Sequence, residues 1–348
     1  MNPAPASEPN TEPEATDTDA SATPFATLTP DRVLDAVESI GFLPDGHLLA
    51  LNSYENRVYQ VGIDDGPPLV AKFYRSGRWS DAAILEEHAF ALELSRREIP
   101  VIPPLEIAGT TLQRFGTFRF SVSPRRGGRD PALDDPEVLE RIGLLLGRLH
   151  LVGACSAFHA RPGLSIERLG ADASAWLLDN DWLPAELRPA YRGVIEHALS
   201  EVRAAFARAG GIASLRLHGD CHRGNILWTD EGAHIVDLDD AVTGPAIQDL
   251  WMLLSGERDE MALQLDHVLT GYEQFRPFDN RELHLVEALR TLRQIHYAAW
   301  LARRWNDPAF PVAFPWFDTQ RFWQDHILAL REQIAAMQEG PLPLGFNR

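Results

Sequence analysis

The apolar positions in the first third of the chain follow two different periods, which predict one helix and then a small sheet. After a helix start signal at residues 29–31, apolar residues recur at helical spacing from Val33 to Val37. Between residues 46 and 73 the pattern changes to short alternating runs, which are interrupted by a turn at residues 64–66. Such alternation is typical of strands with one buried face, so we expect an antiparallel meander here.

The rest of the chain is mainly helical in pattern. Residues 81–98 predict a helix, and further strands are expected near residues 111–123, before a break at Gly127 and Gly128. Beyond the break, helices are expected at residues 136–153, 184–209, 259–276, 280–305 and 319–338. An island of short strands around residues 215–240 interrupts them. This order predicts an α+β protein in which a small antiparallel-sheet lobe precedes a mainly helical lobe.

We expect four segments along the chain. Residues 1–28 are rich in Pro, Ala, Ser and Thr, carry five carboxylates and no basic group, and contain few large apolar side chains. Such a segment buries too little surface to offset its ordering entropy, so a disordered acidic tail is expected. The sheet lobe should then span residues 29–123 and the helical lobe residues 124–338, with a C-terminal tail at residues 339–348.

Composition and charge narrow the class of protein. The 348 residues, 45% of them hydrophobic and 24% charged, are enough for two lobes. Fifty acidic against 32 basic side chains give a net charge of −18, which argues against nucleic acid or an anionic membrane as a partner. The longest apolar stretch, residues 142–158, is broken by Arg148 and His150, so no membrane-spanning helix is expected. The two cysteines, Cys155 and Cys221, and the absence of signal-peptide features favour a reducing cytoplasm.

The island of strands carries the residues that point to chemistry. Its sequence is HGDCHRGNILW at residues 218–228, and IVDLDD follows at residues 235–240. An acid follows a strand, an amide comes five residues later, and a second acid ends the next strand, so we expect Asp220, Asn225 and Asp237 around one cleft. Magnesium prefers oxygen ligands and keeps some of its waters, so one carboxylate and one amide beside nucleotide phosphates would suit it. The remaining acid can orient and deprotonate an attacking hydroxyl.

Lys72 is the only lysine among the 32 basic residues, and it ends the expected third strand in the run VAKF. A coding bias towards arginine is a sufficient reason for the scarcity, yet it leaves the exception to be explained. A guanidinium cannot replace a compact ammonium where one point charge must touch phosphate oxygens. Lys72 is therefore a candidate phosphate ligand. The P-loop signature is absent, because Ala71 and not glycine precedes Lys72.

The pattern HGDxHxGN followed by a strand-borne VD resembles the catalytic and metal-binding segments of the protein-kinase-like superfamily, in the branch that contains aminoglycoside and choline phosphotransferases. The resemblance implies a bilobal kinase fold, ATP as co-substrate and Mg²⁺ as cofactor. It implies Asp220 as the catalytic base, and Asn225 and Asp237 as metal ligands beside the nucleotide, with Asp237 also in the catalytic set. In the same template Lys72 holds the α- and β-phosphates.

The partner of Lys72 should be a glutamate on the following helix, where Glu86 and Glu87 compete. Glu87 shares an apolar stripe with Ile84 and Ala91, whereas Glu86 falls on the polar side of the helix. An acid on an apolar stripe needs a buried cation. We therefore choose Glu87, with a solvated surface acid as the alternative interpretation.

Four further residues have weaker assignments. Ser53 lies in a loop at the place of a phosphate-covering loop; the loop is not glycine-rich, but Ser53 and the backbone amides could contact phosphate. In the resembled family an acid at the position of Asp249 accepts backbone hydrogen bonds from the catalytic loop, and helix N-capping is the alternative. His222 either touches the transferred phosphoryl group or makes a structural hydrogen bond. Cys221 is most simply a packed small residue.

Longer strings extend the resemblance to bacterial serine/threonine protein kinases of this branch. LNSYENRVYQV, VAKFYRSGRWS, HGDCHRGNILW and RRWNDPAFP all take part, and the resemblance spans about residues 31–325. It implies a cytoplasmic enzyme, expected to be a monomer, that takes part in the stress response. Its partners would be ATP and the Ser or Thr residues of proteins, itself included, without nucleic acid or membrane.

Two other functions stay open at this point. A small-molecule hydroxyl kinase for an aminoglycoside, choline or homoserine-like alcohol would share every catalytic residue. The acceptor cleft would discriminate, and Trp300, Trp305 and Trp316 are candidates for its lining, with core packing as the alternative. A catalytically silent nucleotide-binding module is the third possibility, and the joint presence of Lys72 and Asp220 argues against it.

Overall fold

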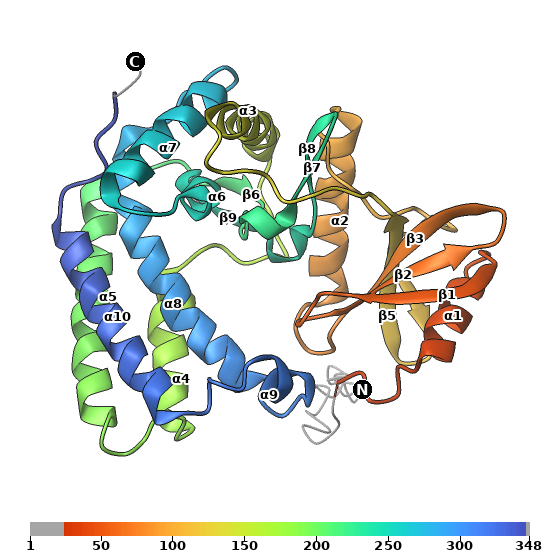
Figure 1. Cartoon of the computed structure of the whole chain (residues 1–348), viewed down its shortest axis with the longest axis horizontal. Coiled ribbons are helices and arrows are strands. Elements are labelled where there is room, and N and C mark those ends of the chain that lie inside the picture. The colour runs from red at the N-terminus through yellow and green to blue at the C-terminus, as the bar shows by residue number, and fades with distance from the viewer. Residues whose placement is uncertain (1–23, 346–348) are drawn as a thin grey trace, which may run out of the picture.

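A five-stranded antiparallel sheet forms the N-terminal lobe in the computed structural model, which describes residues 24–345 (Figure 1). Every pair of neighbouring strands is antiparallel, as the alternating pattern predicted. The strands are β1 (Pro44–Leu51), β2 (Arg57–Ile63), β3 (Gly66–Phe73), β4 (Gln113–Phe115) and β5 (Phe118–Pro124), in the spatial order β1-β2-β3-β5-β4.

Helix α1 (Pro30–Glu38) covers this sheet at the N-terminus. Thr29 caps it by accepting a hydrogen bond from the backbone N–H of Arg32, and its apolar stripe is fully buried in the lobe's core. The expected tail boundary at residue 28 is wrong: Leu28 is buried in the same core, and the ring of Phe25 lies 4.8 Å from the guanidinium of Arg57. Residues 24–28 therefore belong to the lobe, and the rest of the expected tail, residues 1–23, lies outside the described residues.

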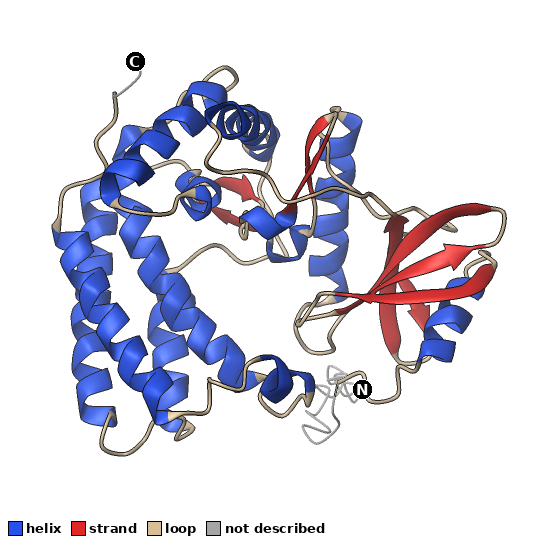
Figure 2. Ribbon diagram, viewed as in Figure 1, coloured by secondary structure: helices blue, strands red, loops and turns tan. Residues whose placement is uncertain are grey.

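Helix α2 (Asp81–Arg96) stands between the two lobes (Figure 2). Ser80 caps it by accepting from the N–H of Ala83, as a serine before an apolar period would. Ile84 on its first turn packs with residues of the N-terminal lobe, whereas Phe90 and Leu94 further along join the core of the C-terminal lobe. One helix thus shares both cores, which fixes the lobes relative to each other.

The C-terminal lobe is mainly helical. Its helices are α3 (Pro136–Gly153), α4 (Asp172–Asp179), α5 (Arg188–Ala209), α6 (Ile247–Leu250), α7 (Arg258–Tyr272), α8 (Val286–Arg303), α9 (Ala309–Ala313) and α10 (Gln320–Gln338). Helices α3 and α7 pack very closely, because Gly143 and Gly271 leave no room for a side chain: a Cβ on Gly143 would lie 1.9 Å from the carbonyl oxygen of Val268. The α+β bilobal fold is confirmed.

Two pairs of short strands lie at the centre of this lobe, as the predicted island required. Strand β6 (Leu215–Leu217) pairs with β9 (Val242–Gly244), and β7 (Ile226–Thr229) pairs with β8 (Gly232–Ile235), both antiparallel. The loops at their ends hold the candidate catalytic residues.

The sequence pattern missed some elements and misplaced others. A π-helical turn at Glu167–Ala171 leads into α4, and neither was expected, because Gly163 and Gly170 give this stretch the character of a loop. The expected helix 280–305 begins as a 3₁₀ segment, Asn280–Leu285, before α8. Residues 339–345 pack against the lobe and so are no free tail, since Leu342 is buried and Arg258 donates to the carbonyl oxygen of Pro341.

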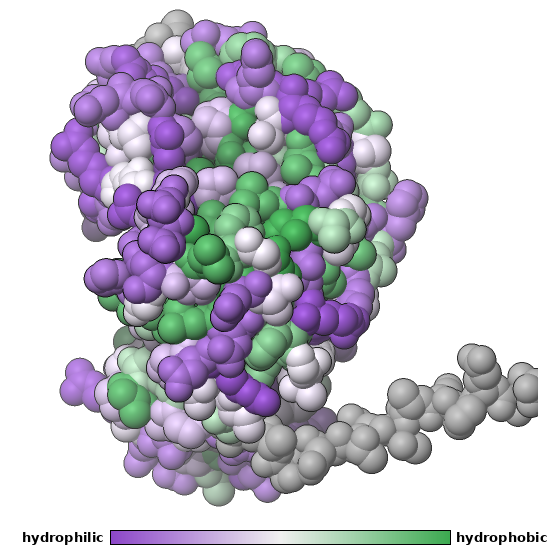
Figure 3. All heavy atoms as spheres, turned by 90° about the vertical axis from the view of Figure 1, so that its right-hand side faces the viewer, coloured by the Kyte–Doolittle hydropathy of each residue, from purple (hydrophilic) through white to green (hydrophobic). Residues whose placement is uncertain are grey.

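Within residues 24–345 no helix has both the length and the apolar composition to cross a membrane. Hydrophilic and apolar side chains both occur on the face of the molecule seen from the side of the sheet lobe (Figure 3). Among the exposed large apolar residues of that lobe are Leu43 and Leu49, which precede or lie on the edge strand β1.

Candidate active site

The loop after β6 and the end of β8 bring together the three residues that the spacing predicted to share a cleft. Asn225 donates from Nδ2 to the backbone oxygen of Asp220 at 2.9 Å, and the N–H of Val236 donates to the backbone oxygen of Asn225 at 3.0 Å. Asp237 follows directly on Val236. The amide of Asn225 is thus tied to the loop through its nitrogen, which leaves its Oδ1 available for a ligand.

Two backbone positions explain why the loop has this sequence. Gly219 has φ +86°, and a Cβ there would lie 2.1 Å from the backbone oxygen of Asp240, so only glycine fits between His218 and Asp220. Asp237 itself is left-handed, at φ 59° and ψ 64°. A non-glycine residue in this region is uncommon and marks a side chain whose direction is fixed by its surroundings.

Asp249 holds this loop in place through hydrogen bonds to its backbone. Its carboxylate accepts hydrogen bonds from the backbone N–H groups of His218 and Gly219, both at 2.8 Å, and it lies 3.0 Å from Nε2 of His150. The expected acceptance of backbone hydrogen bonds is confirmed. N-capping is wrong for Asp249, because the residue lies inside α6.

Lys72 reaches across from the sheet lobe to the acids of the helical lobe. Its Nζ lies 2.7 Å from Oδ1 of Asp237 and 3.2 Å from Oδ1 of Asp239. Burial by itself would lower the pKa of Lys72, but the charges of Asp237 and Asp239 raise it well above its ordinary value. The ammonium is therefore charged, and it lies beside the acid expected to bind metal.

Glu87 is buried on the apolar stripe of α2, as predicted, but its direct ion pair with Lys72 is absent. The ion pairs of Lys72 among the described residues go to Asp237 and Asp239, which are closer. Burial raises the pKa of Glu87 to about 7, and the charge of Lys72 only partly offsets this rise. Glu87 therefore influences Lys72 by its charge and not by contact.

Glu86 has a structural role instead. Its carboxylate accepts hydrogen bonds from three successive backbone N–H groups, those of His159, Ala160 and Arg161, at 2.6–2.9 Å. The segment that it holds places the buried guanidinium of Arg161, which donates to the backbone oxygens of Ala83 and Ala241.

Asp220 has two charged or ionisable neighbours: His222, which the sequence named and which accepts a structural hydrogen bond from the N–H of Gly224, and Arg293, which the sequence did not indicate. Nη1 of Arg293, from α8, forms an ion pair with its Oδ1, and Nε2 of His222 lies 3.5 Å from its Oδ2. Burial by itself would raise the pKa of Asp220, but the hydrogen bond with His222 and the charge of Arg293 lower it below its ordinary value. Asp220 is therefore ionised, as a group that accepts a proton must be.

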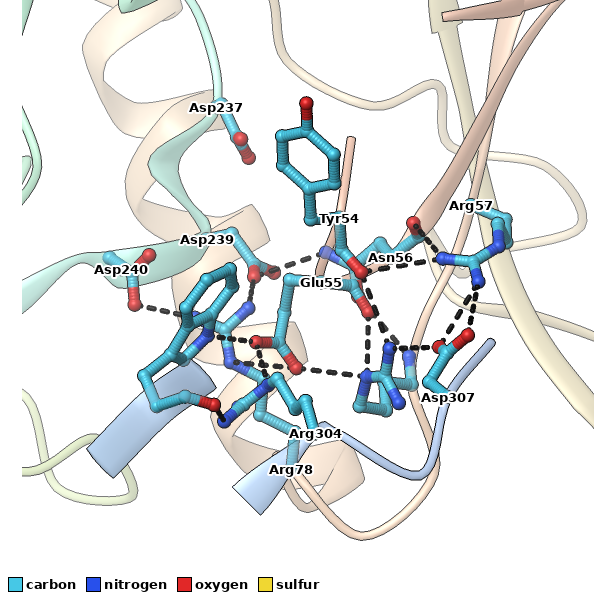
Figure 4. Close-up of polar contacts among 12 residues, drawn as sticks. Tyr54, Glu55, Asn56, Arg57, Arg78, Asp237, Asp239, Asp240, Arg304 and Asp307 are labelled. Carbon is cyan, nitrogen blue, oxygen red and sulfur yellow. Dashed lines mark hydrogen bonds and ion pairs between the residues drawn. The ribbon is translucent and has the colours of Figure 1, made fainter. Parts of the chain in front are cut away.

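A cluster of charged residues that the sequence pattern did not predict connects the β1–β2 loop to the end of α8 (Figure 4). Glu55 in the loop lies 2.6 Å from Nε of Arg304 and accepts a hydrogen bond from Nε1 of Trp300, also at 2.6 Å. Asp307 lies 3.1 Å from Arg57 and 2.7 Å from Arg75. We call the five charged residues Glu55, Arg57, Arg75, Arg304 and Asp307 the interlobe cluster.

Arg78 and Asn56 extend these contacts into the site. Arg78 forms ion pairs with both Asp239 and Asp240, and Asn56 donates to Oδ2 of Asp239 at 3.1 Å (Figure 4). Burial would raise the pKa of Asp239, but Lys72 and Arg78 lower it below its ordinary value. Ser53 lies half-buried in the same β1–β2 loop, two residues before Glu55.

The three tryptophans that were candidates for lining the acceptor cleft are linked through other rings: Trp300 and Trp316 both contact Phe314, and Trp305 and Trp316 both contact Phe317. Trp300 is also part of the contact with the β1–β2 loop, as described above. Trp305 and Trp316 have their nearest ring partners in Phe317 and Phe322, with ring centroids 5.1 and 5.3 Å apart. Core packing is the correct interpretation for Trp305. Cys221 is fully buried, as a packed small residue should be.

Within the described residues no three His, Cys, Asp or Glu side chains are placed to hold a metal ion by themselves. A magnesium site beside nucleotide phosphates needs only one or two protein ligands. The free oxygen of Asn225 and the half-exposed carboxylate of Asp237 supply oxygen donors of the required kind. The residues present therefore fit a magnesium ion.

Comparison with known proteins places this chain in a family. The Phosphotransferase enzyme family (APH) matches residues 47–286. Stress response kinase A of Escherichia coli (strain K12) is 43% identical over 324 residues, which are 93% of this chain and 98% of the relative. Serine/threonine protein kinase RdoA of Salmonella typhimurium is 43% identical over 320 residues, 92% of this chain and 97% of the relative.

Solved structures share the fold at much lower identity. Amicoumacin kinase hAmiN, in complex with AMP-PNP, Ca²⁺ and Ami, has a TM-score of 0.71 at 19% identity and covers 91% of this chain and 96% of its own. A microcompartment-associated aminopropanol kinase has a TM-score of 0.68 at 15% identity, over 90% of this chain and 99% of its own. These similarities identify the fold and leave the acceptor open.

Proposed function

This chain belongs to the Phosphotransferase enzyme family, and on that premise we propose that it is a Mg²⁺- and ATP-dependent protein kinase that phosphorylates Ser or Thr. The observation that carries the proposal is the meeting of Lys72 with Asp237 across the lobes, next to the loop that holds Asp220 and Asn225. A lysine for phosphates, oxygen donors for a metal and an ionised acid for the hydroxyl are the parts that phosphoryl transfer requires.

The relatives favour a protein acceptor over a small molecule. Two curated relatives, 43% identical over almost their whole length, carry the names stress response kinase A and serine/threonine protein kinase RdoA. The two small-molecule kinases of solved structure described above are below 20% identical and support the fold alone. We extend the proposal to a cytoplasmic, monomeric enzyme that acts in the stress response. A small-molecule hydroxyl kinase is the alternative.

Each residue then has a defined task. Asp220 accepts the proton of the Ser or Thr hydroxyl while that oxygen bonds to the γ-phosphorus and the bond from phosphorus to the β–γ bridging oxygen breaks, so that ADP leaves. Lys72 holds the α- and β-phosphates, and Ser53 with its loop covers them. Glu87 acts on Lys72 through its charge, and Asp249 keeps the catalytic loop in place through its backbone hydrogen bonds.

Asn225 and Asp237 would hold the magnesium ion, which neutralises negative charge on the phosphates when it is bound. Lys72 donates a hydrogen bond from Nζ to one carboxylate oxygen of Asp237. Its ammonium is thus already positioned at the place where phosphate oxygens and the metal would meet.

Labelled ATP can test the proposal directly. The purified chain is incubated with Mg²⁺, γ-labelled ATP and a generic acceptor protein, and label on Ser or Thr of that protein or of the chain itself is measured. Asp220→Asn should reduce the transfer by about 10³-fold while nucleotide affinity changes only a few-fold, because the acid acts on the hydroxyl. An unchanged melting temperature would show that the variant is folded.

Two outcomes would contradict the proposal. Turnover of the Asp220→Asn variant close to that of the wild type would remove Asp220 from the reaction. Label that enters only low-molecular-weight alcohols added to a desalted lysate, with no phosphoprotein above the variant's background, would establish the alternative.

A further inference from the structure

Two arginines of the helical lobe lie near acids of the site, Arg293 at Asp220 and Arg168 within the electrostatic reach of Asp240, without a full set of acidic partners. Arg293 projects from α8, its side chain is 43% exposed, and its ion pair goes to Asp220. If Asp220 is the base, as the proposed function holds, this guanidinium lies where the acceptor hydroxyl has to arrive. Arg293 must therefore find another anionic partner, or share Asp220, when an acceptor binds.

Arg168 is the second of these arginines. It lies in the π-helical turn Glu167–Ala171, which packs against α8 so closely that a Cβ on Gly170 would lie 2.8 Å from Cδ2 of Leu292, the neighbour of Arg293. Its Nε is buried and has no hydrogen-bond partner among the described residues. The one acid that acts on its charge is Asp240, which is already bound by Arg78. A buried donor without a partner costs free energy unless a ligand satisfies it.

The charges of both arginines act on His296. It is one helical turn after Arg293 on α8, and its Nδ1 is also buried without a partner among the described residues. Burial first, and then the charges of Arg168 and other arginines including Arg293, lower its pKa to about 4. His296 is therefore neutral near pH 7 and can donate one N–H to an anion without adding charge.

We propose that Arg168, Arg293 and His296 form an anion subsite of the acceptor site, which binds a carboxylate or phosphate group close to the hydroxyl that is phosphorylated. This inference rests on the proposed function, because it takes Asp220 as the base. The chemistry that the subsite requires is a negative charge with oxygen acceptors, and guanidinium groups match such groups well. In a protein acceptor the anion is either an acidic side chain or a residue that is already phosphorylated.

The same arrangement gives the anion a mechanistic effect. An anion in the subsite competes with Asp220 for the guanidinium of Arg293. Once Arg293 is drawn away, an oxygen of Asp220 becomes free to accept the proton of the hydroxyl. Selection of the acceptor and release of the base are thus coupled through Arg293, and a cationic group at this place would repel both arginines.

A set of peptides tests the inference. Each peptide has one central Ser, and the neighbouring residues are Ala, Glu, phosphoserine or Lys. We expect kcat/KM for the Glu or the phosphoserine peptide, or both, to exceed that for the Ala peptide by about 10-fold, and the Lys peptide to be poorer than the Ala peptide. A gain with phosphoserine alone would identify a phosphate as the anion, and a gain with Glu would identify a carboxylate.

Variants assign the preference to the subsite. Arg168→Met and Arg293→Met keep the length of the side chain without its charge, and both should reduce the ratio of acidic to Ala peptide to about 1, because the binding charge is lost. Arg321→Met is the matched control, because Arg321 is an exposed arginine of α10 that pairs with Asp325. It should keep the wild-type ratio. Equal rates for all peptides with the wild type, or a preference that survives both subsite variants, would overturn the inference.

A binding measurement separates this inference from the proposed function. The chain is saturated with Mg²⁺ and ADP, and free phosphoserine is then added. Its melting temperature should rise with phosphoserine in the wild type and in Arg321→Met, but not in Arg168→Met. If no peptide is phosphorylated while this shift is seen, the protein-kinase proposal fails and the subsite stands. An absent shift in the wild type, together with no gain for the Glu peptide, overturns the subsite whatever the acceptor is.

Discussion

The proposed nucleotide side and the proposed acceptor side of the site differ in how their cations are paired. On the nucleotide side Lys72 contacts two acids, and Arg78 contacts three. On the acceptor side Nε of Arg168 has no partner among the described residues, and the only ion pair of Arg293 there is with the acid that we propose as the base. Cations with acidic partners hold elements of the fold in position, whereas we expect a cation that lacks such partners to gain them from a bound ligand. This comparison predicts opposite effects of mutation on the two sides.

The interlobe cluster should give the largest effect on stability. Asp307→Ala removes a carboxylate that is 3% exposed and leaves Arg57 and Arg75 without it. Breaking a buried pair from one side costs on the order of 4 kcal/mol, because the remaining charge stays buried. Urea unfolding of the nucleotide-free chain would measure this loss.

An exposed pair provides the control for this variant. Asp325→Ala on α10 removes the partner of Arg321, and both side chains are largely exposed. We expect a change of less than about 1 kcal/mol, as for other surface pairs. Equal losses in the two variants would show that the interlobe cluster does not hold the lobes together.

The next largest effect is expected from Lys72→Arg, and it should be an effect on catalytic activity. The planar guanidinium cannot reproduce a point contact with phosphates while it also lies between Asp237 and Asp239. We expect kcat/KM to fall by about 10²-fold, the effect of removing one preorganised electrostatic contact. Full activity in this variant would remove Lys72 from the site and break the comparison on the nucleotide side.

Glu87 predicts a dependence of stability on pH. Its folded pKa of about 7 exceeds the ordinary value of 4.5 because of burial, so the folded state retains a proton that the unfolded state has released. The free energy of unfolding therefore falls as pH rises from about 4.5 to about 7. Glu87→Gln should remove this fall. We expect the nucleotide-free variant to be more stable than the wild type by about 2 kcal/mol near pH 8, and the gain to vanish near pH 4.5.

The neighbouring glutamate is the matched control. Glu86 accepts hydrogen bonds from three backbone N–H groups, so Glu86→Gln removes an acceptor from groups that need one. It should lower stability near pH 8, opposite in sign to Glu87→Gln. A loss of stability in both variants would show that Glu87 is bound as an ion, in direct contact with a cation.

The parts of the site that could be predicted from the sequence are those joined by local spacing. Asp220, Asn225 and Asp237 lie in one short strand-loop-strand stretch, and hydrogen bonds within that stretch fix their order. The position of Glu87 on a buried stripe followed from helical periodicity. Its partner did not follow, because periodicity says nothing of the two acids that lie closer to Lys72 in space.

The interlobe cluster and the anion subsite could not be predicted for related reasons. Arg57 and Asp307 are separated by 250 residues, and no local period links a loop to a helix end at that separation. Arg168 lies in a π-helical turn that the sequence pattern did not predict, because the glycines around it are typical of a loop. The fold class could be predicted because the change from period two to helical period is itself local. The interlobe cluster depends instead on how the two lobes close, and the anion subsite on how the π-helical turn packs against α8 within one lobe.

Arg168→Met should have the smallest effect on stability, and its sign is the most informative. The wild type buries Nε of Arg168 without a partner, and the other charges that act on it most strongly after Asp240 are the like charges of Arg161 and Arg78. Removing an unsatisfied buried donor and keeping an apolar stem should leave the nucleotide-free chain as stable as the wild type, or about 1 kcal/mol more stable. Urea unfolding beside Asp307→Ala would compare a cation without a partner with a paired carboxylate directly. A loss as large as that of Asp307→Ala would mean that Arg168 has a structural partner, and the difference between the two sides of the site would then disappear.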